Sequence, residues 1–299
     1  MGGRSRPGLG SVGWPSRRAR AASSTAPRSA ATESVSLTGQ SYGPGRPRVT
    51  LPALHVAVLS DIHSNRQALE AVLAAVEEQG VEQIWCLGDM VGYGADPDAC
   101  TALVRERCST CLVGNHDLAL LGALDISTFS EAAAAAVEWT RENVSAETVE
   151  FLGSLEPSAS QAGVGLFHAS PRDPIWEYVL ATDQAEAGFE AQEERVGLIG
   201  HSHIALYFVR LPGKNGGFAQ GAQAGEGAEL KIGEGEWLLN PGSVGQPRDG
   251  DPRAAWLELD TERWTARYHR VPYEFEAAAA AIRAAGLPDV LAERLEVGR

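Results

Sequence analysis

The sequence contains no long uninterrupted hydrophobic run. Its 299 residues are 44% hydrophobic and 21% charged, which is ordinary for a globular protein. No apolar stretch approaches the roughly 18–20 residues that a membrane-spanning helix requires. We therefore expect a soluble, cytoplasmic protein without a membrane partner.

Basic residues are scarce beyond the first fifty positions. That first segment has eight arginines and one acidic residue, Glu33, so it carries a charge of +7, whereas the rest of the chain carries −21. Such an acidic body argues against a protein that binds nucleic acid through a basic surface. An anionic substrate would need a strong local source of positive charge, and bound metal ions could supply it.

Residues 1–50 also lack apolar periodicity and are rich in Arg, Ser, Gly, Pro and Ala. This composition cannot bury enough apolar surface to fold, so it predicts a disordered extension. An Arg-rich, Ser-rich, acid-poor segment also resembles an organelle transit peptide. A third interpretation is that the start of the protein has been assigned too far upstream. The sequence does not choose among the three. No apolar segment follows Arg17–Arg18, which argues against an export signal.

Cysteine is rare. The chain has four cysteines, Cys86, Cys100, Cys108 and Cys111, of which the last two form a lone CxxC motif. A zinc knuckle needs a second pair, and a redox pair should open a helix in a thioredoxin-like unit. Neither context is present, so we expect reduced and partly buried thiols.

Short apolar runs that end in polar clusters recur from residue 54 onward. They are Leu54–Ser60, Gln83–Leu87, Thr110–Val113, Val164–Phe167 and Val196–Ile199. Runs of this length, bounded by glycine and turn residues, fit strands that are buried on both faces. Helical patterns at Gln67–Gln79 and Pro97–Arg107 separate the first three. Strand and helix alternating at this spacing predict right-handed βαβ units and a parallel sheet.

The later half of the chain has more strand patterns than helical ones. Five runs there could form a second, antiparallel sheet: Tyr207–Arg210, Leu230–Ile232, Trp237–Leu239, Ala254–Leu259 and Trp264–Arg270. We therefore predict an α/β fold with two stacked sheets flanked by helices, as one domain over residues 51–299. A helical cap is expected at about 118–155, a mobile hairpin loop at Pro212–Gly227 and a helical tail at 274–299. Oligomerisation is not indicated.

Polar residues follow each predicted strand. In open α/β sheets, ligands bind beyond the carboxyl ends of the strands. The chain places eight metal-ligating or acid–base residues there: Asp61, His63, Asp89, Asn115, His116, His168, His201 and His203. A single histidine after a strand is usually a hydrogen-bonded core or turn residue, but this clustering predicts a metal site.

The types of ligand indicate the metal. Imidazole and carboxylate without thiolate suit Mn, Fe, Zn or Ni better than calcium, and we take manganese as the expected ion. All of these residues except His116 are candidate ligands, and seven ligands are enough for two ions that share a carboxylate. Two divalent ions, two aspartates and a bridging hydroxide leave a charge of about +1, which attracts phosphate. Such a pair also activates water and holds a phosphoryl group for in-line attack.

Five separated motifs resemble the signature of the calcineurin-like metallophosphoesterases. They are Asp61-x-His63, Gly88-Asp89, Gly114-Asn115-His116-Asp117, His168 and Gly200-His201-x-His203. The resemblance spans about residues 55–250 and implies a four-layer αββα sandwich of two mixed sheets. It implies one metal held by Asp61, His63, Asp89 and His203, and a second held by Asp89, Asn115, His168 and His201. It also implies that a metal-bridging hydroxide attacks phosphorus, with His116 as general acid or transition-state stabiliser.

The segments 61–65, 92–97 and 240–248 look like those of a small prokaryotic branch of that superfamily. Some members of this branch hydrolyse diadenosine tetraphosphate, phosphodiesters or phosphoproteins. Asp117 could orient His116, or it could bond within its own loop. The predicted substrate contacts are Asn65, Tyr93, Ser243 and Arg248. Arginine offers a bidentate fork to phosphate, and Tyr93 could stack on a nucleobase. A tight turn at Ser243 and an exposed turn aromatic at Tyr93 are the alternatives.

The predicted function is hydrolysis of phosphate esters or anhydrides in a small phosphorylated substrate. This covers a phosphodiesterase, a phosphatase and a dinucleoside polyphosphate hydrolase, with a phosphoprotein phosphatase as an alternative. A metal oxygenase would normally use two histidines and one carboxylate, which the doubled ligand set disfavours. A non-catalytic scaffold of this fold is an alternative of another class, and the intact ligands and His116 argue against it.

Overall fold

The computed structural model describes residues 53–214 and 217–299, so the extension expected at residues 1–50 lies outside the described part. The strands are β1 (His55–Leu59), β2 (Gln83–Cys86), β3 (Thr110–Cys111), β4 (Ser158–Gln161), β5 (Val164–Phe167), β6 (Val196–Leu198), β7 (Ala205–Arg210), β8 (Gln220–Gln223), β9 (Glu229–Lys231), β10 (Glu236–Pro241), β11 (Ala254–Asp260) and β12 (Thr265–Val271). The helices are α1 (Arg66–Glu78), α2 (Pro97–Arg107), α3 (Asn115–Leu120), η1 (Ile126–Thr128), α4 (Glu131–Asn143), α5 (Ala146–Leu152), α6 (Thr182–Ala191), α7 (Phe275–Ala284) and α8 (Asp289–Val297). No helix among the described residues has both the length and the apolar character needed to cross a bilayer.

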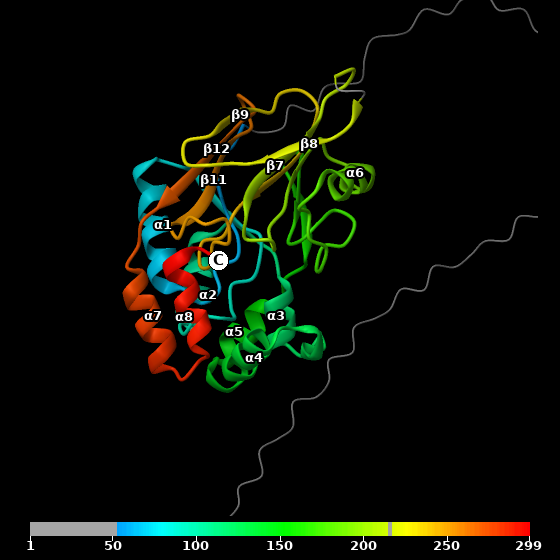
Figure 1. Ribbon diagram of the computed structural model, residues 1–299. Coiled ribbons are helices and arrows are strands. Elements are labelled where there is room, and N and C mark those ends of the chain that lie inside the picture. Colours follow the sequence, from blue (N-terminus) through cyan, green and yellow to red (C-terminus); the bar gives the residue numbers. More distant parts are fainter. Residues whose placement is uncertain (1–52, 215–216) are drawn as a thin grey trace, which may run out of the picture. The chain divides into compact units, whose positions relative to one another are not determined.

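Two mixed six-stranded sheets form the centre of the fold (Figure 1). The first has the strand order β3-β2-β1-β11-β12-β9, and the second has the order β4-β5-β6-β10-β7-β8. Strands β1, β2 and β3 pair in parallel, as do β5, β6 and β10. The first parallel set is extended on one side by antiparallel strands, with β11 beside β1. The second is extended on both sides, with β7 beside β10 and β4 beside β5. The α/β architecture with two mixed sheets is confirmed.

Alternation along the strands divides the core into layers. In β1, Val56 and Val58 face a cluster that also contains residues of β5, β6 and β10, so this cluster lies between the sheets. Ala57 and Leu59 face the opposite side and pack with α1 and α2. Helix α6 covers the outer face of the second sheet, where Phe189 packs with residues of β7 and β10. Helix, sheet, sheet and helix therefore follow one another as four layers.

The assignment of the later strands to one antiparallel sheet is wrong. Strands β9, β11 and β12 extend the first sheet, and β7 and β10 belong to the second. The reason is long-range pairing, because β11 covers the edge of β1 with His55 opposite Asp260. The predicted loop Pro212–Gly227 contains β8, whose residues are all exposed and thus lack an apolar pattern. Helix α6 was also absent from the sequence prediction.

The cap region and the tail meet beside one loop of the candidate site. The region 118–155 contains the end of α3, then η1, α4 and α5, and the tail forms α7 and α8. Alanines of α4, Ile282 of α7 and Leu291 of α8 share a hydrophobic cluster with Tyr93. The tail helices are thereby held next to the loop that follows β2. The four cysteines are free thiols.

Candidate metal centre

The candidate ligands lie in loops at the carboxyl ends of parallel strands. Asp61 and His63 follow β1, Asp89 follows β2, Asn115 begins α3 just after β3, His168 follows β5, and His201 and His203 follow β6. Each is at most 4% exposed. Parallel strands end at the same edge of a sheet, and the two stacked sheets bring their edges together, so the structure unites all seven predicted ligands.

The backbone of these loops is strained. Five of the seven ligands have a positive φ, between 50° and 64°: Asp61, His63, Asp89, His201 and His203. Residues other than glycine rarely adopt this left-handed conformation, and they keep it only where the surroundings enforce it. Backbone strain of this kind concentrates at functional sites. The loops are therefore shaped to aim these side chains rather than to minimise backbone energy.

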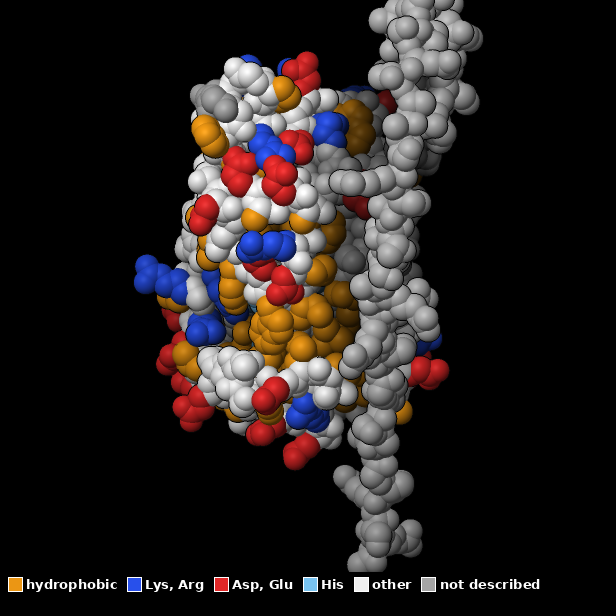
Figure 2. All heavy atoms as spheres, turned by 90° about the vertical axis from the view of Figure 1, so that its right-hand side faces the viewer, with side chains coloured by type: hydrophobic (Ala, Val, Ile, Leu, Met, Phe, Trp, Pro, Cys, Tyr) orange, Lys and Arg blue, Asp and Glu red, His pale blue; other side chains and the backbone are white. Residues whose placement is uncertain are grey.

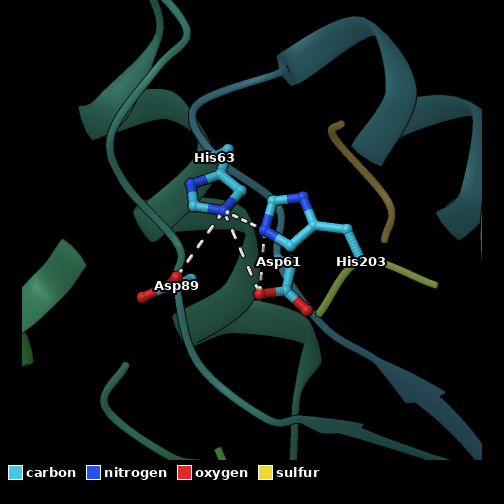
Figure 3. Close-up of side chains that lie close together, drawn as sticks. All are labelled: Asp61, His63, Asp89 and His203. Atoms are coloured by element: carbon cyan, nitrogen blue, oxygen red, sulfur yellow. Dashed lines mark hydrogen bonds and ion pairs between the residues drawn. The ribbon is translucent and has the colours of Figure 1, made fainter. Parts of the chain in front are cut away.

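Four side chains converge to form the first cluster (Figure 3). Nε2 of His63 lies 3.0 Å from Nε2 of His203 and 3.6 Å from Oδ2 of Asp89. Oδ1 of Asp61 lies 3.4 Å from Nε2 of His203 and 4.0 Å from Nε2 of His63. The four atoms belong to a group that could hold one metal ion.

The tautomers of the two histidines explain why their ring nitrogens face each other. Nδ1 of His63 lies 3.0 Å from the carbonyl oxygen of Val91, and Nδ1 of His203 lies 2.7 Å from that of Gln246. A carbonyl only accepts, so each Nδ1 carries the proton and each Nε2 presents a lone pair. Two lone pairs cannot hydrogen-bond to each other, but both can bind one cation. Carbonyl-oriented histidines of this kind are typical of metal ligands.

The second cluster repeats this arrangement. Nδ1 of His168 lies 3.0 Å from the carbonyl oxygen of Leu87, so its Nε2 presents a lone pair to Oδ1 of Asn115 at 3.0 Å. The same Nε2 lies 3.6 Å from Oδ2 of Asp89. Asp89, His168 and His201 form a second group that could hold a metal. Asp89 belongs to both groups, and its position allows it to bridge two ions.

Unpartnered polar atoms test whether these residues fit two cations. Within the described part of the chain, Oδ1 of Asp61, Oδ2 of Asp89 and Nε2 of His201 are buried without a hydrogen-bond partner. Their other oxygens are engaged: Oδ2 of Asp61 accepts from the His201 amide and Oδ1 of Asp89 from the His116 amide. Leaving such atoms unpaired is costly. They all point into the two clusters, so the residues present fit a pair of metal ions.

Burial dominates the electrostatics of the cluster. Burial raises the pKa of Asp61 to about 7 and that of Asp89 well above its ordinary range. It also lowers the pKa of His63 and His203 well below 6.5, so both are neutral at physiological pH. Neutral imidazole is the form that binds metals, and a bound cation would favour the ionised carboxylates.

His116 lies beside the clusters and contributes to neither. Its Nδ1 is buried without a partner among the described residues, and its ring packs edge-on against His63 and Phe129. The Asp117 carboxylate accepts from the amides of Val91 and Gly114 and makes no hydrogen bond to the His116 ring. The bond to Gly114 lies within its own loop, which was the alternative to orienting His116, and the bond to Val91 connects this loop to the one after β2.

Two predicted substrate contacts have structural roles instead. Asn65 caps α1 by accepting from the Ala68 amide, and its Nδ2 donates to the Gly245 carbonyl at 2.8 Å. The Ser243 hydroxyl donates to the Asp61 carbonyl at 2.7 Å and accepts from the Gln246 amide at 2.8 Å. Both side chains are buried, and these internal bonds replace the predicted contacts with substrate.

Tyr93 and Arg248 keep positions that suit a substrate contact. The Tyr93 ring lies 4.5 Å from that of His63 and 4.4 Å from that of His116, and its hydroxyl accepts from Nη2 of Arg248 at 3.2 Å. Tyr93 is 8% exposed, so it is not the exposed turn aromatic that was the alternative. Nε of Arg248 is buried without a partner among the described residues.

Three aromatic residues around the centre were missed by sequence reasoning. Tyr178 stacks on His201 with ring centroids 4.2 Å apart, and Phe129 packs on His116 at 5.1 Å. Trp176 contacts Phe129 at 5.3 Å. Phe129 comes from the cap and the other two from the segment between β5 and α6. The only available signal was the Trp-Glu-Tyr triplet after His168, and no local pattern places such a triplet in space.

Comparisons with known proteins agree with this geometry. The sequence profile of the calcineurin-like phosphoesterase superfamily domain matches residues 54–262. An uncharacterized protein of Methanocaldococcus jannaschii is 38% identical over 249 residues, which cover 82% of this chain and 98% of that protein.

Solved structures show the same relationship. The crystal structure of a metallophosphoesterase from Sphaerobacter thermophilus has a TM-score of 0.75 at 37% identity, covering 83% of this chain and all of that one. A hypothetical protein from Pyrococcus horikoshii has a TM-score of 0.66 at 21% identity, covering 82% and 99%, and shares the fold. With a family match over most of the described residues and a buried Asp/His cluster suited to two metals, the chain belongs to the calcineurin-like phosphoesterase superfamily.

Proposed function

We propose that the protein is a binuclear-metal-dependent hydrolase of phosphate esters or anhydrides that acts on a small phosphorylated substrate. The observation that carries the proposal is the position of Asp89, which belongs to both ligand groups. Its Oδ2 lies 3.6 Å from Nε2 of His63 and 3.6 Å from Nε2 of His168. The similarity to a metallophosphoesterase of Sphaerobacter thermophilus supports the same class.

The charge of the site suits a phosphate. Asp61 and Asp89 are the only acidic residues in the two ligand groups, and the histidines there are neutral. Two divalent ions, with manganese as our first choice, would supply a positive centre that binds phosphoryl oxygens and activates water. This local positive charge would attract an anion to a chain whose net charge is −14.

His116 is the candidate proton donor. In hydrolysis, a water oxygen bonds to phosphorus, the bond from phosphorus to the leaving oxygen breaks, and that oxygen takes up a proton. Nδ1 of His116 is free to make this contact. Burial, with Arg248 nearby, lowers the pKa of His116 to about 3. We propose that His116 donates the proton to the leaving oxygen through this ring nitrogen.

Arg248 is the candidate phosphate contact. Its guanidinium is partly buried, is held by the Tyr93 hydroxyl and by Oε1 of Gln246, and keeps Nε without a partner among the described residues. A guanidinium oriented in this way can donate to a phosphoryl oxygen. Tyr93 holds the arginine and covers His63, and we propose that it orients Arg248 toward the substrate.

A panel of phosphate compounds tests the proposal. Purified protein with Mn²⁺ should hydrolyse at least one of bis-p-nitrophenyl phosphate, p-nitrophenyl phosphate, diadenosine tetraphosphate and a phosphoserine peptide. The panel also separates a phosphodiesterase from a phosphatase, a dinucleoside polyphosphate hydrolase and a phosphoprotein phosphatase. Bound metal without turnover of any compound would favour the non-catalytic scaffold.

His116→Ala should lose about 100-fold or more in kcat while it binds the same amount of metal, because general acid catalysis contributes about 10²–10⁴-fold. His269→Ala is the matched control, since His269 pairs with Glu258 and belongs to neither ligand group. An unchanged kcat in His116→Ala would refute the acid role.

A further inference from the structure

A groove of about 840 Å³ lies beside the candidate metal centre. Its lining combines aromatic and basic side chains, namely Phe129, Trp176, Tyr178, Arg248, Arg294 and Arg299. Figure 2 shows hydrophobic side chains gathered in a broad area on one face, with charged side chains at its borders. Trp176 and Tyr178 are 37% and 43% exposed. Exposed apolar side chains that lie together often mark a ligand-binding groove.

The aromatic side of the groove touches the centre directly. Tyr178 stacks on His201 of the second ligand group, and Phe129 packs on His116. Trp176 contacts Phe129 and lies edge-on to His201 at 6.4 Å. A flat aromatic group bound to this wall would therefore be a neighbour of the phosphate held at the metals. Stacking on such a wall is favourable for any nucleobase.

The basic side of the groove comes from two distant parts of the chain. Arg248 follows β10, Arg294 lies in α8 and Arg299 comes after it. Among the described residues, the guanidinium groups of Arg294 and Arg299 form no ion pair and no hydrogen bond. Several other arginines are paired with acids, as Arg66 is with Glu70 and Arg283 with Asp289. Asp125 is the only acidic residue in the lining.

This excess of positive charge contrasts with the rest of the chain. The whole sequence carries −14, yet three arginines and one aspartate line the groove. Two of these arginines are additional to the one that we assign to the reacting phosphate. Charge complementarity therefore indicates that the ligand of the groove has an anionic group besides the reacting phosphate, and the aromatic wall indicates that it has a planar ring.

We propose that the groove selects a nucleotide with at least one phosphate beyond the one that is hydrolysed. Its base packs on Phe129, Trp176 and Tyr178, and its additional phosphate binds Arg294 and Arg299. The inference rests on the proposed hydrolase function, because it places the reacting phosphate at the metal centre. It assigns helix α8 and the segment after it a part in specificity.

Three probes separate the parts of this recognition. ATP has a base and additional phosphates, AMP has the base and a single phosphate, and inorganic tripolyphosphate has phosphates without a base. We would measure kcat/KM for each with the full chain and Mn²⁺. Where a probe is not turned over, its Kd from equilibrium dialysis replaces kcat/KM.

Two variants address the two sides of the groove. Arg294→Ala combined with Arg299→Ala should reduce kcat/KM or affinity about tenfold for ATP and tripolyphosphate, and less for AMP, because hydrogen bonds to charged groups are lost. Trp176→Ala should reduce kcat/KM or affinity for ATP and for AMP about tenfold relative to that for tripolyphosphate, because base stacking is lost. Arg283→Ala and Phe218→Ala are matched controls, since both residues are exposed and lie outside the groove.

The outcomes distinguish the two proposals. Selective losses in the groove variants, with unchanged controls, support the inference. Equal effects on all three probes, or no effect, overturn it, as does wild-type protein that neither binds nor hydrolyses ATP. Hydrolysis of a p-nitrophenyl phosphate in that last case leaves the hydrolase function standing. No turnover of any compound, with selective nucleotide binding in dialysis, refutes the hydrolase function and retains the nucleotide groove.

Discussion

Asp61→Asn is expected to stabilise the metal-free protein and to destabilise the metal-loaded one. Asp61 is fully buried, and burial raises its pKa to about 7 from 3.8. A carboxyl group with a raised folded-state pKa costs stability as the pH rises from about 4 to about 7, and the full cost persists above that. Asparagine removes this charge, keeps an oxygen that can accept from the His201 amide and has an amide N–H that can donate to Nε2 of His203.

The magnitude follows from the pKa. The difference between about 7 and 3.8 corresponds to about 4 kcal/mol at pH 8. For a domain of this size, 1 kcal/mol shifts Tm by roughly 2–4 °C, so a rise on the order of 10 °C is expected in EDTA. Metal offsets this difference at about 1,000 times its Kd, where the additional ion stabilises the wild type by about 4 kcal/mol, and a larger excess of metal reverses the order.

Thermal unfolding at pH 8 in EDTA and in excess Mn²⁺ measures both effects, and metal analysis counts the ions bound. Wild type should bind two ions per chain and the variant about one, since Asp61 belongs to the first group alone. The reasoning is refuted if the variant melts below wild type in EDTA or keeps both ions.

Asp249→Asn is the matched control. Asp249 is paired with Arg270, and both side chains are at most 6% exposed. Removing this charge leaves Arg270 buried without its partner, which should cost about 3 kcal/mol. We expect this loss in both buffers and no change in the number of ions. A rise in Tm for Asp249→Asn in EDTA would show that the removal of any buried carboxylate is stabilising.

Three further predictions concern residues around the centre. Gly114→Ala should lower metal affinity about tenfold or more, because the new Cβ would collide with the carboxylate of Asp89 that the two ligand groups share. Metal titration by calorimetry measures this, and an unchanged affinity would contradict the structure. Asn65→Ala should lower Tm by about 5–10 °C through the lost helix cap and an unpaired carbonyl, with unaltered metal content, which chemical denaturation and metal analysis would test. Burial would raise the pKa of Glu258, but hydrogen bonds with His55 and His269 outweigh burial and hold that pKa below 4.5. The stabilisation that these two bonds give the folded protein is therefore present above pH 4.5 and lost in acid. Glu258→Gln should therefore be less stable than wild type at pH 6 and approach it below pH 4, and a constant difference in urea unfolding would rule this out.

Much of the site could be predicted because it depends on local sequence. Buried parallel strands leave continuous apolar runs, and β1, β2, β5 and β6 were recognised in this way. Each run is followed by its polar ligands, and the carboxyl ends of parallel strands share one edge. Asp61, Asp89 and His201 could therefore be assigned to one centre although they lie far apart along the chain.

Other features could not be predicted because they depend on contacts between distant segments. The alternation of apolar and polar residues in β1 and β11 does not indicate whether β11 pairs with β1 or with the second sheet. Asn65 and Ser243 look like phosphate contacts by residue type, but the carbonyl and amide groups that engage them are known only once the loops are packed together. The exposed strand β8 carries no apolar pattern at all.

The sequence by itself determined which residues make up the centre, because these ligand types suit metal ions and each ligand lies shortly after a strand. The tertiary structure alone decided how the centre is surrounded. Folding brings Tyr178 onto His201, Phe129 of the cap onto His116, and Arg294 of α8 into the groove beside them. The physical reason is that ligand type is a local property, whereas the shape and charge of a groove arise from side chains that only packing brings together.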